Sequence, residues 1–438
     1  MSTAPAPQRG PLERTAREGD DACPGALRLH PADDGALARV RVPGGVLTDR
    51  QADALGEAAS RLGDGVLHLT SRGNVQLRGV GEGCGRELAA LLDAAGLLPS
   101  FAHERVRNVV ASPLSGLDGR GAADVRPWLT ELDALLCASG AARGLSGRFL
   151  FALDDGRGDV AALGADVTLT AVAGGGALLR LGAGGLADGV LRLPGGAAAR
   201  GALLAAESFL DAARGAAWRM SDLPGPVGEL AAEVGRRLAA EGVEAVRERG
   251  AAPGGGGGPA PGVVPGAVDG RAALSVLAPL GRISAAQWEL LAGCARADGS
   301  GELRLTPWRG VVVPGVAGGR APGRLADLAA SGLVTDPASP WVGVGACIGR
   351  PGCAKSLADV RGDAGEAVAA VEAVRGPAGG GLPVYWSGCE RRCGRPAADH
   401  VDVVAGVGGY RVGVRGVAAA VGRRDLPTAV ERARATAP

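Results

Sequence analysis

The sequence repeats itself at an interval of 236 residues, and this repeat constrains the fold more than any other feature. Pro43 falls on Pro279 and Gln51 on Gln287, and the two halves run in register without a gap. Matches of Ala or Gly carry little weight in a chain with 76 glycines, but Pro and Gln matches at one offset do. A fixed period over a long stretch indicates two copies of one structural unit.

Each copy predicts the same order of elements. A strand-like run is followed by a glycine turn and by a helix that a hydroxyl residue caps, at Thr48 or Ser284. Two more strands and a second helix complete a βαββα unit. The strands and second helix are expected at 66–70, 74–79 and 84–95 in the first copy and at 302–306, 310–315 and 322–331 in the second. Two such units side by side can bury one another's exposed sheet.

The repeat divides the chain into six segments. A polar, Pro-containing tail that we expect to be disordered comes first, and a Gly/Pro-rich linker separates the two copies. The predicted segments are the tail at 1–25, a half-domain at 36–100, a larger α+β repeat at 105–245, the linker at 251–270, a second half-domain at 271–335 and a second larger repeat at 340–438.

Four cysteines in the last segment form two pairs with the spacing of metal ligands. Cys347 and Cys353 are spaced C-x5-C, and Cys389 and Cys393 are spaced C-x3-C, in loops rich in Gly and Pro. This quartet suits a 4Fe–4S cluster held by four thiolates. A zinc site remains an alternative, although zinc pairs are usually closer in sequence, and so do disulfides or inert thiols. The other four cysteines are scattered, and we expect them to be buried as small apolar residues.

The net charge, the length of apolar runs and the first residues limit which partners and which compartment are expected. The net charge is +1, which gives no reason to expect nucleic acid as a partner. No run of 18 apolar residues predicts a membrane span, and the first residues do not have the pattern of a secretory signal. The sequence therefore predicts a cytoplasmic protein, in which clustered cysteines stay reduced and free to bind metal.

The two copies diverge where the cysteines lie. At the offset of 236, the four cysteines fall on Ala111, Leu117, Leu153 and Arg157 of the first copy, which has no ligand there. The first copy is instead basic and polar in two runs, at 70–78 and 105–108. Arginines of this kind can bind carboxylates or another anion. The alternative is a basic strand face that is only solvated.

These motifs resemble a known family. The run Thr-x-Arg-x-Asn-x-Gln-Leu-Arg-Gly from Thr70, the Val-Arg-Asn run ending at Asn108, and the cysteine quartet are similar to the sirohaem-type nitrite and sulfite reductases over about residues 36–416. The resemblance implies an α+β fold with two ferredoxin-like half-domains and two cluster- or tetrapyrrole-binding repeats. It also implies that the four cysteines hold a 4Fe–4S cluster, and that Cys393 bridges the cluster to a haem iron.

The chain departs from the reductases where their pair of lysines grips sulfite or nitrite. Only Arg148 is basic in the matching stretch, and Leu150 stands where the second Lys would be. The short chain is more similar to the short branch of the family, the precorrin-3B synthases of cobalamin biosynthesis. In that branch a tetrapyrrole, precorrin-3A, is the substrate, and a monooxygenase uses dioxygen to hydroxylate the ring and close a γ-lactone.

The resemblance assigns roles to particular residues. Arg72, Arg107 and Arg148 are expected to be catalytic and to point into a pocket whose opposite wall includes Cys393. The substrate-binding set implied is Arg72, Asn74, Gln76, Arg78, Arg107, Asn108, Arg148, Arg309 and Arg391.

The resemblance also implies cofactors and partners. Besides the cluster it implies a non-haem iron, whose ligands the sequence does not identify, and a reduced electron donor that is ferredoxin or linked to NAD(P)H. Two other functions stay open at this point. One is a nitrite or sulfite reductase that binds sirohaem, and the other is a non-catalytic iron–sulfur electron carrier.

Overall fold

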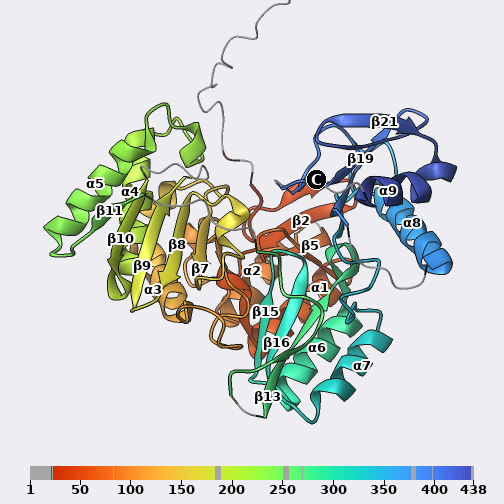
Figure 1. Ribbon diagram of the computed structural model, residues 1–438, viewed down its shortest axis with the longest axis horizontal. Coiled ribbons are helices and arrows are strands. Elements are labelled where there is room, and N and C mark those ends of the chain that lie inside the picture. Colours follow the sequence, from red (N-terminus) through yellow and green to blue (C-terminus); the bar gives the residue numbers. More distant parts are fainter. Residues whose placement is uncertain are drawn as a thin grey trace, which may run out of the picture.

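The computed structural model describes residues 21–435, except residues 22, 82, 183–188, 250–255, 269, 376–380 and 397. Two half-domains occupy the centre, and the two larger repeats lie on opposite sides of them (Figure 1). None of the helices described is both long and apolar enough to cross a membrane.

The two half-domains contain the same elements at equivalent positions. The first comprises β1 (His30–Ala32), β2 (Gly35–Val40), β3 (Val46–Thr48), α1 (Asp49–Leu62), β4 (Val66–Leu69), β5 (Val75–Val80) and α2 (Gly85–Ala94). The second comprises β12 (Gly262–Pro265), β13 (Arg271–Leu277), β14 (Arg282–Ser284), α6 (Ala285–Ala297), β15 (Glu302–Leu305), β16 (Gly310–Ala317) and α7 (Ala321–Ala330). Thr48 and Ser284 each form a capping box with the Gln three residues later, as their sequence positions predict.

The half-domains exchange one short strand each. Strand β14 of the second half-domain pairs with β4, so that the first sheet has the order β1-β2-β5-β4-β14. Strand β3 of the first half-domain pairs with β15 in the same way, and the second sheet has the order β12-β13-β16-β15-β3. The predicted pair of equivalent units is therefore confirmed; they are related by pseudo-twofold symmetry, and the two sheets are joined through the exchanged strands.

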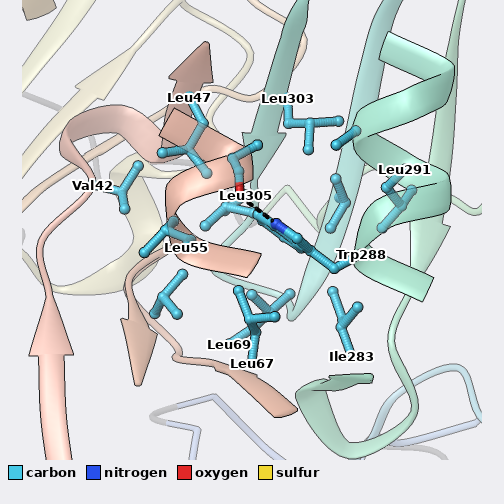
Figure 2. Close-up of a cluster of buried hydrophobic side chains, with 14 of the residues drawn as sticks. Val42, Leu47, Leu55, Leu67, Leu69, Ile283, Trp288, Leu291, Leu303 and Leu305 are labelled. Carbon is cyan, nitrogen blue, oxygen red and sulfur yellow. Dashed lines mark hydrogen bonds between the residues drawn. The ribbon is translucent and has the colours of Figure 1, made fainter. Parts of the chain in front are cut away.

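One hydrophobic core fills the space between the half-domains. Helices α1 and α6 bring leucines from both copies together around Trp288, which is fully buried (Figure 2). The indole Nε1 of Trp288 donates a hydrogen bond of 2.7 Å to the carbonyl oxygen of Ala52 on helix α1. The copies are thus held together by apolar burial and a directional contact, not only by the linker.

Each larger repeat is a sheet with helices packed against it. The first has the strand order β11-β10-β9-β8-β7-β6 and the second has the order β17-β18-β19-β20-β21. The first repeat comprises β6 (Val109–Ala111), α3 (Arg126–Ala138), β7 (Phe151–Asp154), β8 (Val167–Val172), β9 (Gly176–Leu181), β10 (Val190–Pro194), α4 (Ala198–Ala213), α5 (Val227–Ala240) and β11 (Val246–Glu248). The second comprises β17 (Val344–Ala346), α8 (Val360–Arg375), β18 (Val384–Ser387), β19 (Val401–Gly406), β20 (Gly409–Val414), β21 (Val417–Val421) and α9 (Leu426–Ala435).

Two of the predicted segment boundaries need correction. Within the predicted tail, residues 1–20 and 22 lie outside the described residues, but Asp21 is buried and accepts hydrogen bonds from Ser146 and Gly147. Within the predicted linker, residues 251–255 and 269 lie outside the described residues, but Gly262–Pro265 forms strand β12, which pairs with β13. In both cases the partner lies outside the predicted segment: the carboxylate of Asp21 binds residues of the first repeat, and β12 pairs with β13.

Candidate iron–sulfur site and arginine cluster

The four predicted ligands converge at one edge of the second repeat. Cys347 directly follows β17 and Cys389 follows β18, and these two strands are parallel neighbours. Because the carboxyl ends of parallel strands meet at the same edge of a sheet, both pairs of cysteines arrive together. Burial raises the pKa of the Cys393 thiol, and the charges of Cys347, Cys389 and Cys353 raise it further, so the other three cysteines lie close enough to act on Cys393.

The spacing of the sulfurs distinguishes between the kinds of metal site. All eight cysteines are free, so none of the quartet forms a disulfide. Among the described residues, no three of the four sulfurs lie within 4.8 Å of one another. A tetrahedral zinc ion needs sulfurs roughly 3.8 Å apart, whereas the four irons of a cubane each take one thiolate and so accept more widely spaced cysteines. The arrangement therefore fits a 4Fe–4S cluster better than a single zinc ion.

Backbone groups and one aromatic side chain position the cysteine loops. The N–H of Gly388 donates to Sγ of Cys347 at 3.2 Å, a contact typical of cluster-binding loops. Gly is required at position 388 because a Cβ there would lie 2.0 Å from Oγ of Ser356. The hydroxyl of Tyr385 donates to the carbonyl of Cys393 at 2.7 Å.

The first repeat keeps this geometry without the cysteine. Ser112 N–H donates to the carbonyl of Leu153 just as Cys347 N–H donates to that of Trp386. The N–H of Asp155 donates to Oγ of Ser112 at 3.1 Å, which reproduces the contact of Gly388 with Cys347. The residue equivalent to Cys347 is therefore Ser112. The sequence alignment at a constant offset of 236, which placed Ala111 there, is wrong by one residue at this point because the repeats differ in length.

A second site gathers five arginines, which we call the arginine cluster: Arg39, Arg41, Arg72, Arg148 and Arg219. Arg41 and Arg72 both donate to the carbonyl of Gly147. Arg148 is exposed, with its guanidinium 4.2 Å from the ring centroid of Trp218, and it also interacts with the thiol of Cys23.

The arginines of the arginine cluster are partly buried and act on one another's charges. Burial, together with the charges of Arg39 and Arg72, lowers the pKa of Arg41 to about 9. Burial, together with the charges of Arg219 and Arg39, lowers the pKa of Arg72 to about 10. Both pKa shifts are due first to burial and then to the neighbouring arginines. Among the described residues, Arg219 alone of the five forms a salt bridge, to Asp166 at 2.6 Å, so an added anion would offset the repulsion among the others.

The structure does not place every predicted residue at this site. Arg107 is buried and donates to both carboxylate oxygens of Asp133 at 2.7 Å and to the carbonyl of Leu97. The amides of Asn74 and Asn108 are hydrogen-bonded to one another in the buried joint between strand β5 and the first repeat. The prediction that Arg107, Asn74 and Asn108 bind substrate is therefore corrected: their polar groups are committed to the fold.

The remaining predicted residues lie apart from the arginine cluster, except Gln76, which contacts its member Arg39. Arg78 donates to both oxygens of Asp34 and to the carbonyl of Gly352, so it ties the first half-domain to the first cysteine loop. Arg309 lies over the ring of Tyr385.

Arg391 is exposed, and its charge partly opposes the rise in the pKa of the neighbouring Cys393. Arg309 and Arg391 thus accompany the cysteines, while Arg72 and Arg148 accompany the first repeat. No contact between the two groups is recorded among the described residues.

Sequence reasoning missed three members of the arginine cluster: Arg39, Arg41 and Arg219. Arg39 and Arg41 alternate with buried Ala38, Val40 and Val42 on one strand, so a two-residue period could have placed both on one face. Arg219 lies more than a hundred residues away, and nothing in the sequence joins it to Arg72.

Three buried carboxylates in the first repeat form a group that could be mistaken for a second metal site. Asp154, Asp155 and Asp159 are the only such group among the described residues. Asp154 already accepts four backbone N–H groups, and Asp155 is paired with Arg157. These hydrogen bonds show that the group organises a loop.

Comparisons with known proteins agree with this architecture. The nitrite/sulfite reductase ferredoxin-like half domain matches residues 30–95 and 266–331, two segments that are 236 residues apart. The NirA protein of Mycobacterium tuberculosis has the same fold, with a TM-score of 0.71 and 21% identity over 91% of this chain and 80% of that one. The chain therefore contains two ferredoxin-like half-domains of the nitrite/sulfite reductase type and has the α+β fold predicted, and its similarity over most of its length is to an enzyme.

Two kinds of curated relative differ in how much of this chain they match. The precorrin-3B synthase of Sinorhizobium is 29% identical over 95% of this chain and 88% of its own length. The ferredoxin–nitrite reductase of Synechococcus elongatus is 34% identical, but over only 28% of this chain and 25% of its own length. That of Leptolyngbya laminosa is 31% identical over 24% of this chain and 21% of its own length.

Proposed function

We propose that the protein is a precorrin-3B synthase, a monooxygenase that converts precorrin-3A to precorrin-3B in cobalamin biosynthesis. One atom of dioxygen would enter the macrocycle as a hydroxyl group, with closure of a γ-lactone by an acetate side chain. The other atom would leave as water with two electrons and two protons from a reduced donor. The observation that carries the proposal is similarity to a precorrin-3B synthase along 95% of the chain.

The arginine cluster supports a tetrapyrrole as substrate. Precorrins carry many acetate and propionate groups, and arginine binds carboxylates through paired, charge-assisted hydrogen bonds. Arg72 and Arg148 are the side chains we assign to substrate binding, with Arg39, Arg41 and Arg219 supplying further positive charge. Since burial and mutual repulsion lower the pKa values of Arg41 and Arg72, a bound carboxylate would relieve an unfavourable interaction.

The cysteine quartet supports a redox role for the second repeat. Cys347, Cys353, Cys389 and Cys393 would hold a 4Fe–4S cluster, which supplies electrons one at a time when it is bound. The N–H of Gly388 would stabilise the reduced, more negative state through its contact with Cys347. We assign the donor to ferredoxin or an NAD(P)H-linked reductase.

Leu150 argues against a sulfite or nitrite reductase. Its side chain is buried among Val110, Ala152, Val160 and Ala165, so no cation replaces the second lysine of the reductases at that position. An oxyanion in that place would lack a charged hydrogen-bond donor that stabilises developing charge.

Anaerobic purification followed by turnover tests the proposal. The holoprotein should convert precorrin-3A to a hydroxylated lactone only when dioxygen and reductant are both present, and ¹⁸O₂ should label the product with one atom. Absorption spectra should show the broad band of the cluster. Bound sirohaem, with reduction of nitrite or sulfite and no change in precorrin-3A, would favour the reductase and overturn the proposal.

A further inference from the structure

A large cavity with charged and apolar side chains in its walls lies beside the first cysteine loop, apart from the arginine cluster. Its volume is about 640 Å³, and its walls include Arg282 on strand β14, His68 on strand β4 and the segment Ile348–Gly352. A volume of this size is typical of small-molecule sites, which are usually about 300–1,000 Å³. No residue predicted to bind the tetrapyrrole lines this cavity.

The equivalent place in the other copy is filled. His68 corresponds to Arg304, which is 2% exposed and reaches into the first repeat. Arg304 donates to the carbonyls of Pro113 and Ser115 and is paired with Glu302. His68 is shorter than Arg304 and leaves the space beside the first cysteine loop open. The cavity therefore depends on this difference in sequence and does not follow from the shared fold.

Three arginines border the cavity without an ion pair to any described carboxylate. Arg361 donates to the carbonyl of Cys347 and contacts Nδ1 of His68, and Arg350 donates to the carbonyl of Ser356. Burial and the charge of Arg282 lower the pKa of Arg361 to about 10. Arg282 is exposed at the mouth of the cavity.

The three carboxylates at the cavity wall, Asp34, Asp64 and Asp359, each have hydrogen-bond partners other than Arg282, Arg350 and Arg361. Asp34 accepts two hydrogen bonds from Arg78. Asp64 accepts from the N–H of Val66 and contacts Nε2 of His68, while Asp359 accepts from the N–H of Gly362. None of these carboxylates forms a salt bridge with Arg282, Arg350 or Arg361, so the charges of the three arginines are not paired by them.

We infer that this cavity binds a small organic or inorganic molecule carrying two or more phosphate or carboxylate groups. Arg282 and Arg350 would bind it from the mouth, and Arg361 from the inner wall. Because Arg361 also donates to the carbonyl of Cys347, the occupant would be linked to the cluster loop through a single side chain. The inference does not depend on the identity of the tetrapyrrole or on the reaction.

Calorimetric titration of the anaerobic holoprotein tests the inference, with pyrophosphate and citrate as separate probes. We expect at least one probe to bind below millimolar concentration, and the stronger of the two identifies phosphate or carboxylate as the preferred group. Arg282→Glu should weaken binding by ten- to a hundredfold, since it removes a charged hydrogen-bond donor and adds repulsion. Arg86→Glu, at an exposed position on helix α2, is the matched control and should leave binding unchanged.

A second variant separates this cavity from the arginine cluster. Val66→Glu with His68→Arg copies the Glu302–Arg304 pair of the filled counterpart, so it should abolish binding without changing the net charge. Arg72→Ala should leave this binding event intact. The inference is overturned if neither probe binds below millimolar concentration, if the filled variant binds like the parent, or if Arg72→Ala removes the signal.

Discussion

Trp288 donates its indole hydrogen bond to the backbone carbonyl of Ala52, and these two residues are the same position in the two copies of the repeat. Because equivalent residues of the two copies contact each other here, the contact lies at the pseudo-twofold axis. Two large side chains would clash at this axis, and pairing a tryptophan with an alanine avoids the clash. The two copies therefore differ in sequence at the axis, and this difference provides a hydrogen bond between them.

Replacing the indole should weaken the joint between the half-domains. Trp288→Phe loses the 2.7 Å hydrogen bond and part of the buried volume, so we expect a loss of about 1–3 kcal/mol in the free energy of unfolding. Urea unfolding of the apoprotein measures the change. Trp341→Phe, at a half-buried position, is the control and should cost less than half as much. Equal losses in the two variants would contradict the role given to Trp288.

The repeat could be predicted because residue matches at a fixed offset and helix caps can be recognised in the sequence without knowledge of the fold. The sequence also predicted the convergence of the cysteines, since two ligand pairs of this spacing must meet to share one cluster. It did not predict the exchange of β3 and β14, because three-residue strands have too little pattern to reveal their partner. The role of Arg107 was missed because Asp133, its partner, lies on a helix whose orientation only the folded core determines.

Removal of one ligand should release the cluster and leave the fold in place. Cys389→Ser should lower the iron content from four per chain to near zero and remove the visible absorption band, since a serine oxygen binds iron less well in such sites. Cys84→Ala is the control because Cys84 lies on the half-domain side, before helix α2. Iron analysis and absorption of anaerobic protein give the answer. Full retention of iron in Cys389→Ser would show that Cys389 is not a ligand.

Two arginines of the family motifs should behave differently on substitution. Arg72→Ala should weaken tetrapyrrole binding by ten- to a hundredfold and leave stability nearly unchanged, because among the described residues its guanidinium makes a single, long hydrogen bond. Arg107→Ala should instead lower the free energy of unfolding by about 2–4 kcal/mol, because it leaves Asp133 without its partner.

Fluorescence quenching by a carboxylated tetrapyrrole, together with urea unfolding, separates the two effects. Arg28→Ala, in the same N-terminal part of the chain, is the control for loss of a positive charge. If Arg107→Ala binds weakly but unfolds like the parent, then Arg107 faces the substrate after all and its assignment to the fold is wrong.

Asp159 should make the first repeat less stable as the pH rises. Burial raises the pKa of its carboxyl to about 6, a hydrogen bond from Ser112 opposes this, and the charge of Asp154 adds to it. Since the pKa in the folded state lies above the unfolded value of about 3.9, the stabilising protonated form is present below pH 4 and is lost as the pH rises through 6. Asp159→Asn should therefore gain about 1–3 kcal/mol over the parent at pH 7.5 and almost nothing at pH 4.

Asp118→Asn provides a control of opposite sign. Burial tends to raise the pKa of Asp118, but hydrogen bonds from Arg157 and Arg120 outweigh it and the pKa is lowered. The charged form of Asp118 therefore stabilises the fold above the unfolded pKa, and its replacement should cost stability at pH 7.5 and little at pH 3. Urea unfolding of the three proteins across this range measures both trends. If Asp159→Asn is no more stable than the parent at pH 7.5, the prediction is wrong. The neighbours of Asp159 then offset the cost of burying its charge, and the Ser112–Asp159 pair stabilises the loop at neutral pH.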